Sequence, residues 1–263
     1  MIGRARLAFT VLAFGYAFLY LPIALVMVYS FNESRLVTVW SGFSLKWWSA
    51  LFANEAMLSA AWLSLRLAIA SATVATVIGL AAGYVLARVP RFFGRTLFAG
   101  LVIAPMVMPE VVMGISMLLL FVGADRLFGW PDRGFLTIAI GHTTFSLAFV
   151  AIVVQARLAD FDRSLEEAAM DLGATPWIAF RTVTLPLIAP AIDAGWLLAF
   201  TLSLDDLILT QFVAGAQSQT LPMRVYSSVR LGVDPQINVL GTIVVCIAAS
   251  ALVLSGWLTR HKS

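Results

Sequence analysis

The chain has 263 residues, of which 61% are hydrophobic and 12% are charged. A soluble domain of this length could not bury so much apolar surface, so the composition excludes a soluble protein and predicts a polytopic membrane protein. The formal net charge of +3 reflects cytosolic arginine and lysine in such a protein, which argues against nucleic-acid binding.

Six apolar segments are each long enough to cross a bilayer as a helix. They cover roughly residues 7–31, 59–87, 96–122, 135–157, 187–213 and 236–258. The first is too long for a signal peptide, and no small-residue cleavage site follows it, so we expect an uncleaved span. Because no repeat, flexible linker or low-complexity segment divides the chain, we expect a single all-α membrane domain over 1–263.

Basic residues favour an orientation with both termini in the cytosol, because the inner segments then carry more arginine and lysine than the outer ones. This orientation places the charged loop 158–186 in the cytosol. It places the Trp-rich segment 32–58 outside, where two interpretations stay open. The tryptophans form an aromatic belt at the headgroups, or they form a docking surface for a periplasmic partner.

Loop 158–186 contains signals for two short helices. Ser164 with Glu167 three residues later forms a capping box, which predicts a first helix over 165–172. Gly173 can supply the left-handed residue that ends this helix.

Thr175 then predicts the N-cap of a second short helix, with Pro176 at its first position and Pro186 marking the return to the membrane. On these caps alone, an amphipathic loop that lies on the membrane is the alternative interpretation.

The spacing in this loop resembles the EAA motif of ABC importer permeases. In that motif Glu-Ala-Ala is followed by three residues, Gly, nine residues, an aliphatic residue, one residue and Leu-Pro. Here the pattern comprises Glu167, Ala168, Ala169, Gly173, Val183, Leu185 and Pro186. The single departure is Val183, where isoleucine is usual.

The resemblance extends over nearly the whole chain, and it is to the permease subunits of bacterial polyamine importers, especially the putrescine type. The stretches that carry it are Tyr29-Ser30-Phe31-Asn32, Ala104-Pro105 with Pro109, Asp162-Arg163-Ser164, Leu202-Ser203-Leu204-Asp205-Asp206-Leu207, Thr220-Leu221-Pro222, Ser227-Ser228-Val229-Arg230 and Pro235-Gln236-Ile237-Asn238. It implies an inner-membrane location and the type I importer permease fold, with six transmembrane helices and a cytosolic coupling helix.

The resemblance also implies partners: a second, similar permease, two cytosolic ATPase subunits and a periplasmic polyamine-binding protein. The chain has no GxxxxGK[ST] phosphate loop, so ATP and Mg²⁺ would bind to the ATPase subunits and this chain would be a transport subunit without catalytic residues or a cofactor. With only two histidines, a histidine-rich metal site is excluded. The residues expected to couple to the ATPase are Glu166, Glu167, Ala168, Ala169, Asp171, Leu172, Gly173, Pro176, Leu185 and Pro186.

Ionisable residues inside a bilayer are costly and usually face a cavity or a partner. Within the predicted spans they are Arg66, Glu110, Asp193, Asp205 and Asp206, so acids outnumber bases. Carboxylates would stabilise ammonium groups as water is removed, which independently favours a cationic solute.

Adjacent helical residues point about 100° apart, so Asp205 and Asp206 cannot both face one pore. We expect one of them to form a structural ion pair with Arg66 and the other to meet the substrate. The alternative is that both only hold helices together.

Three further residues are candidates for the substrate pathway. Glu110 follows two prolines in an interrupted helix, although it could instead be a neutral carboxyl bonded to freed backbone. Trp196 and Phe200 share one helical face, where they either bind a polyamine through cation–π contact or pack against other helices. His142, in mid-span, is expected to form an interhelical hydrogen bond.

The sequence therefore predicts a permease subunit that moves putrescine, spermidine or both from the periplasm to the cytoplasm. An ABC permease for another cationic or small solute is one alternative, and a stand-alone secondary carrier is another. A membrane enzyme is excluded because no catalytic triad, paired catalytic carboxylate motif or metal cluster is present.

Overall fold

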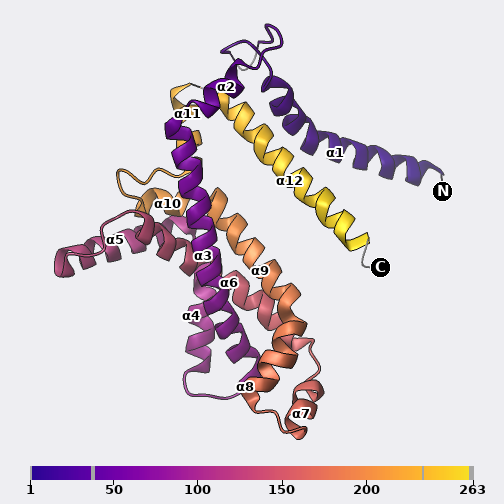
Figure 1. Ribbon diagram of the computed structural model, residues 1–263, viewed down its shortest axis with the longest axis vertical. Coiled ribbons are helices and arrows are strands. Elements are labelled where there is room, and N and C mark those ends of the chain that lie inside the picture. The colour runs from indigo at the N-terminus through magenta and orange to yellow at the C-terminus, as the bar shows by residue number, and fades with distance from the viewer. Residues whose placement is uncertain (1, 37–38, 233, 261–263) are drawn as a thin grey trace. The chain divides into compact units, whose positions relative to one another are not determined.

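The computed structural model describes residues 2–36, 39–232 and 234–260, with side chains described between 9 and 250. This part of the chain is almost entirely helical, as the all-α prediction requires (Figure 1). Its contacts divide into two compact units, Met1–Ser59 with Arg224–Ser263, and Ala60–Met223. Two helices, α3 (Glu55–Arg88) and α11 (Leu221–Leu231), each begin in one unit and end in the other.

The first unit joins the two ends of the chain. Helix α1 (Ile2–Tyr29) packs on α12 (Gln236–Arg260), and the short α2 (Lys46–Phe52) also packs on α12. Between α1 and α2 the chain is folded. The Asn32 side chain donates to the Val39 carbonyl at 2.7 Å, and the Phe31 ring stacks on Trp48 with centroids 5.4 Å apart. Trp48 is therefore a packing residue of a folded segment.

The second unit is built around α6 (Phe135–Ala159). Helices α4 (Arg95–Val107), α9 (Leu185–Asp205) and α10 (Ile208–Val213) pack against α6, and α5 (Glu110–Phe128) packs on α10. Its largest buried apolar cluster joins α3, α6 and α9. The cluster comprises Ala72, Ala75, Val150, Val154, Leu158, Ile188 and Ala199.

Small residues allow α3 to approach α6 closely. A Cβ atom added at Gly79 would lie 2.7 Å from the Val150 Cβ, and one added at Gly83 would lie 2.6 Å from the Ala151 carbonyl oxygen. Glycines four residues apart on a membrane helix commonly form such a contact face, because helices in lipid associate through close packing. The α3–α6 contact therefore depends on both glycines.

Two of the predicted spans are interrupted. The segment predicted over 96–122 forms α4 and α5, with Met108 (φ −71, ψ 138) and Pro109 (φ −58, ψ 132) extended between them. Pro109 has no N–H to continue a helix and disfavours helical geometry at Met108, which explains the break. The segment predicted over 187–213 breaks at Asp206 (φ −65, ψ 125) into α9 and α10.

Five helices in the described part of the chain are long and apolar enough to cross a membrane, against the six predicted spans. They are Phe9–Tyr29, Glu55–Arg88, Glu110–Phe128, Phe135–Ala159 and Pro176–Leu204. Two shorter apolar helices, Arg95–Val107 and Gln236–Ser250, lie within the predicted third and sixth spans.

Candidate coupling segment and solute pathway

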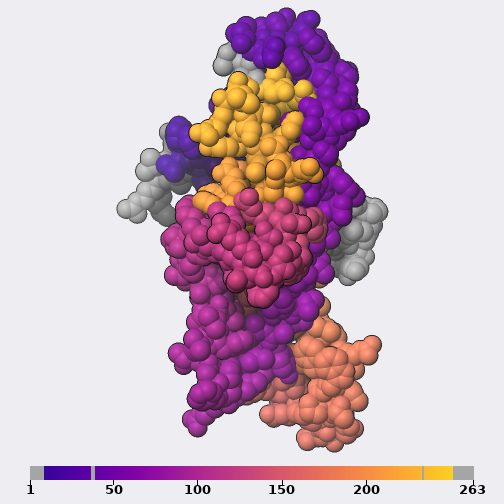
Figure 2. Space-filling view, turned by 90° about the vertical axis from the view of Figure 1, so that its left-hand side faces the viewer, coloured from indigo at the N-terminus to yellow at the C-terminus, as the bar shows by residue number. Residues whose placement is uncertain are grey.

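The loop 158–186 contains the two helices that its sequence predicts, α7 (Ser164–Asp171) and α8 (Pro176–Ala179). Gly173 has φ +93, the left-handed value that ends α7, and Thr175 caps α8 by accepting the Ile178 N–H at 3.4 Å. This segment projects from one end of the second unit (Figure 2). A projecting pair of capped helices offers a surface to another protein.

The predicted capping box is wrong in one respect. Ser164 is the first residue of α7, and its N–H donates to Asp162 Oδ1 at 2.9 Å, so Asp162 supplies the cap. This hydrogen bond lowers the pKa of the Asp162 carboxyl, because the ionised form accepts it better. Asp162 and Ser164 are both good caps, and Arg163 takes helical angles (φ −65, ψ −22), which starts the helix one residue early.

The second helix continues into the membrane-spanning helix. After α8 the chain forms one π-helical segment, η1 (Phe180–Thr184), and then α9, whose first two residues are Leu185 and Pro186. Pro186 cannot donate to the carbonyl four residues earlier, and a π-helical turn accommodates this loss. Pro186 is thus part of a continuous helical path.

Arg88, at the end of α3, holds α7 in place. Its Nη2 lies 3.2 Å from Glu166 Oε1, and its Nη1 donates to the Leu158 carbonyl at 3.2 Å. The same Glu166 oxygen accepts a hydrogen bond from Thr184 Oγ1 at 2.7 Å. The guanidinium also lies over the Phe161 ring, 5.2 Å from its centroid. Glu166 therefore faces into the protein.

The opposite face of the segment is exposed. Leu172 is 91% exposed, although it is apolar, and α7 has no buried residue. An apolar side chain so exposed at a helix end is accessible to a partner. The exposed residues of this face are Glu167, Ala168, Asp171, Leu172, Gly173 and Pro176. Ala169 is half-buried.

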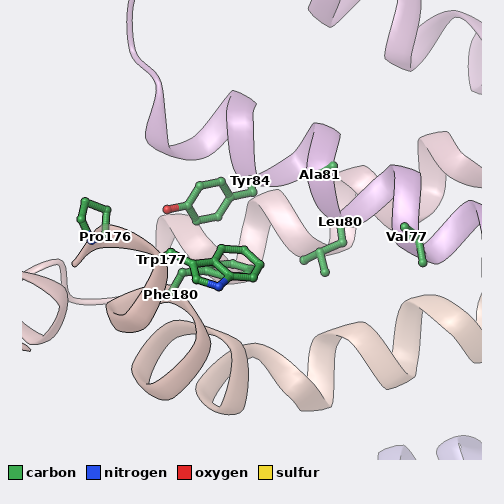
Figure 3. A pocket seen from close by; sticks show the side chains of 7 residues that line it. All are labelled: Val77, Leu80, Ala81, Tyr84, Pro176, Trp177 and Phe180. Atoms are coloured by element: carbon green, nitrogen blue, oxygen red, sulfur yellow. The ribbon is translucent and has the colours of Figure 1, made fainter. Parts of the chain in front are cut away.

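An apolar groove of about 440 Å³ lies between α3 and α8 (Figure 3). Tyr84 of α3 meets Phe180 edge-on with ring centroids 5.0 Å apart, and Trp177 stacks on Phe180 at 5.6 Å. These aromatic contacts hold α8 against α3. The groove is lined by Val77, Leu80, Ala81, Tyr84, Pro176, Trp177 and Phe180. No carboxylate is among these residues, so we do not assign a cationic solute to it.

Three acidic residues lie at the two helix breaks. Glu110 is the first residue of α5, directly after the α4–α5 break, and Asp205 is the last residue of α9. Asp206 lies in the break before α10. Helix α5, which begins at Glu110, packs on α10, which begins two residues after Asp206. The structure thus packs the break that carries Glu110 near the break that carries the two aspartates, although Glu110 is far from them in the sequence.

The two aspartates have different surroundings. Asp206 Oδ2 accepts the Thr210 N–H at 2.8 Å and lies 3.2 Å from His142 Nε2, whereas Asp205 is exposed. The expected ion pair with Arg66 is wrong. Among the described residues no ion pair joins Arg66 to either aspartate, and its guanidinium lies 5.4 Å from the Phe135 ring centroid. His142, on the neighbouring helix α6, pairs with Asp206 instead.

Trp196 and Phe200 have a packing role in the structure. Their rings stack with centroids 5.3 Å apart, and both pack against the buried α3–α6–α9 cluster. Trp196 Nε1 donates to Thr73 Oγ1 at 3.2 Å, so the indole is anchored to α3. This is the packing alternative that the sequence left open.

Comparison with known families identifies the class of protein. Residues 75–261 match the family described as "Binding-protein-dependent transport system inner membrane component". The chain belongs to this family of permeases.

Curated relatives of the permease include polyamine transport proteins. It is 52% identical to the putrescine transport system permease protein PotI of Escherichia coli K12, over 92% of this chain and 87% of the relative. It is 42% identical to the spermidine/putrescine transport system permease protein PotC of the same organism, over 94% of this chain and 92% of the relative. The predicted resemblance to polyamine permeases is confirmed.

Solved structures confirm the fold. A bacterial ABC transporter that imports the acidic polysaccharide alginate superimposes with a TM-score of 0.71 at 16% identity, over 98% of this chain and 96% of that chain. The MetNI methionine ABC transporter gives a TM-score of 0.61 at 19% identity, over 79% of this chain and 96% of that chain. The permease thus has the ABC importer fold. Its family and its curated relatives show that it is a transport subunit.

Sequence reasoning missed several residues that the permease structure places at these sites. Arg88 counts in the sequence only as a basic residue at the end of a span, and Thr184 gives no signal at all. Ser203 and Thr210 are polar residues in an apolar segment, which is the one available hint that they bond to His142.

Proposed function

We propose that this permease is the membrane-spanning subunit of an ATP-driven importer that carries a polyamine, putrescine or spermidine, from the periplasm to the cytoplasm. The observation that carries the proposal is that Glu110, Asp205 and Asp206 lie at two helix breaks whose following helices, α5 and α10, pack together. Interrupted helices commonly form solute sites in transporters, because the freed backbone and side chains line a cavity. The names of the curated relatives support the same solute class.

Family membership alone does not fix the solute. The permease is also 33% identical, over 78% of its length, to the molybdenum transport system permease protein ModB of Haemophilus influenzae. The solute must therefore follow from particular side chains. Among the described residues neither Glu110 nor Asp205 forms an ion pair, which leaves two carboxylates for the ammonium groups of a polyamine.

The proposed orientation in the membrane follows from the charges around residues 158–186, the coupling segment. We place this end of the second unit in the cytosol, with both chain termini on the same side, because positive charge is retained there. Its arginines are Arg88, Arg91, Arg95, Arg157, Arg163 and Arg181.

The exposed face around Glu167 and Leu172 then docks on an ATPase subunit. A second permease, a second ATPase subunit and a periplasmic binding protein complete the proposed importer. Because this chain has no phosphate loop, ATP and Mg²⁺ bind to the ATPase subunits.

The test is transport by the purified complex in liposomes, with binding protein loaded with putrescine, loaded with spermidine, or empty. We expect a loaded binding protein to stimulate ATP hydrolysis, and we expect Glu110→Gln and Asp205→Asn to reduce uptake by about tenfold or more. Asp193→Asn is the matched control, because Asp193 is an exposed carboxylate elsewhere on α9. Stimulation by neither polyamine refutes the solute, and uptake without the ATPase subunits indicates a secondary carrier.

A further inference from the structure

Helix α9 ends at Asp205 and α10 begins at Ile208, so the backbone between them leaves the helical hydrogen-bond ladder. In a membrane such a break needs other partners for its polar groups. One such partner is the carboxylate of Asp206, whose Oδ2 accepts the Thr210 N–H at 2.8 Å. This bond closes the first turn of α10 but does not connect α10 to α9.

The connection between the two helices comes from a residue of α6. His142 Nδ1 lies 2.6 Å from Ser203 Oγ in the last turn of α9, and His142 Nε2 lies 2.8 Å from Thr210 Oγ1 in α10. The same Nε2 lies 3.2 Å from Asp206 Oδ2. A single imidazole thus bonds to the residues before the break, inside it and after it.

The ring has little room to move. His142 is 2% exposed, Ser203 4% and Thr210 0%. The preceding residue, Gly141, lies so close to α10 that a Cβ atom there would be 2.8 Å from Leu209 Cδ2. A buried imidazole with a partner for each nitrogen is costly to disturb, because each lost bond leaves a polar group without water.

The contacts of His142 with Ser203 in α9 and with Thr210 in α10 form a tether across the break. Asp205 lies between these two residues in the sequence. Its backbone follows Ser203 by two residues and precedes Asp206 directly, so the tether holds the backbone that carries this exposed carboxylate. We propose that His142 is a positioning residue: it ties α9 to α10, which packs on α5, and thereby positions Asp205 relative to Glu110 for the solute. This inference rests on the proposed function, because it needs Asp205 and Glu110 to bind the polyamine.

The tether has two halves, which substitutions can separate. The amide nitrogen of asparagine takes the place of Nδ1, so His142→Asn keeps the bond to Ser203 and loses those to Thr210 and Asp206. The amide nitrogen of glutamine takes the place of Nε2, so His142→Gln does the reverse. Ser146→Ala is the matched control on the same helix, because the buried Ser146 hydroxyl has no hydrogen-bond partner among the described residues.

The measurement is the number of polyamine molecules imported per ATP hydrolysed, with saturating loaded binding protein and the complete complex in liposomes. We expect both histidine variants to lower this ratio by about fivefold or more, since each breaks the tether at one end. A loss of folding would lower the amount of complex and leave the ratio unchanged. We also expect Asp205→Asn to cause no further fall in either histidine variant, because the two changes act through one carboxylate.

The outcomes separate the two proposals. If the wild-type complex imports no polyamine, the proposed function and the tether fail together. If the wild-type complex imports polyamine and both histidine variants keep its ratio, only the tether is refuted. A fall that adds fully to that of Asp205→Asn also refutes it. If neither histidine variant assembles, Ser203→Ala and Thr210→Val each remove one tether bond and carry the same expectation.

Discussion

Replacing Glu166 with alanine removes the side chain that holds α7 to the membrane-spanning helices. Glu166 Oε1 accepts hydrogen bonds from Arg88 at 3.2 Å and from Thr184 at 2.7 Å. The side chains of Arg88 and Glu166 are only 8% and 15% exposed. In Glu166→Ala the guanidinium keeps the Leu158 carbonyl, while the buried Thr184 hydroxyl loses its acceptor.

The size of the effect follows from these contacts. A hydrogen bond to a charged group is worth about 1.5–3 kcal/mol, and breaking a fully buried ion pair costs about 3–5 kcal/mol. Because this pair keeps some contact with solvent, we expect a local cost of about 2–4 kcal/mol. That cost corresponds to about a 30- to 1,000-fold shift in the equilibrium between docked and undocked α7. No buried side chain of α7 is present to offset it.

Hydrogen exchange of the backbone amides in 158–186 measures this shift directly. We expect faster exchange there in Glu166→Ala, with the α3–α6–α9 core unchanged, and a lower ratio of uptake to ATP hydrolysis. Glu167→Ala is the control, because its side chain is exposed: exchange should stay at the wild-type rate while binding to the ATPase weakens. Wild-type exchange in Glu166→Ala would refute the view that Glu166 docks the segment.

Three further substitutions test other parts of the structure. Gly83→Leu places a side chain where even a Cβ would lie 2.6 Å from the Ala151 carbonyl oxygen, so thermal unfolding should show a loss of stability of about 1–3 kcal/mol. Gly123→Leu is the control and should show no loss, because nothing lies within 4 Å of a Cβ there. Leu172→Ser should weaken association with the ATPase subunit by about tenfold or more in a pull-down, because the leucine side chain is 91% exposed in this chain and would be buried only in the proposed complex. Trp196→Leu should lower the free energy of unfolding by about 1–3 kcal/mol, because it removes the stacking on Phe200 and the hydrogen bond to Thr73. It should leave the preference between putrescine and spermidine unchanged, and an altered preference would show that Trp196 contacts the solute.

The local features of the coupling segment could be predicted from the sequence because they depend on neighbouring residues. Gly173 reaches a left-handed angle at no steric cost, and Thr175 followed by Pro176 specifies a helix start. The error at Ser164 has the same local origin. Two good capping residues lie two positions apart, and their spacing does not decide between them.

The contacts across the fold could not be predicted in this way. The bond between Arg88 and Glu166 joins residues that are 78 positions apart, and that between His142 and Asp206 joins residues 64 positions apart. The sequence pointed to Arg66 as the partner because it was the one basic residue within a span. It contained no signal that α6 would place a histidine at the break. That break itself contains neither proline nor glycine, unlike the one at Pro109.

Helix α9 connects the proposed coupling segment, residues 158–186, with the proposed solute site at Glu110, Asp205 and Asp206. This connection explains how the two sites can differ in chemistry and still work together. Its first residues, Leu185 and Pro186, end the coupling segment, and its last residue is Asp205, so its 21 residues span about 30 Å at 1.5 Å per residue. Side chains that far apart share no contact, so substitutions at Glu166 and Asp205 should have additive effects on stability. Transport is different, because any displacement of α7 and α8 reaches the acidic residues along one helix that packs tightly on α6. In α9 the small residue Gly195 lies against Val150 of α6, where a Cβ would be 3.3 Å from its side chain. A helix packed so closely on α6 connects the two sites rigidly, and the contacts of His142 extend this connection across the break to α10.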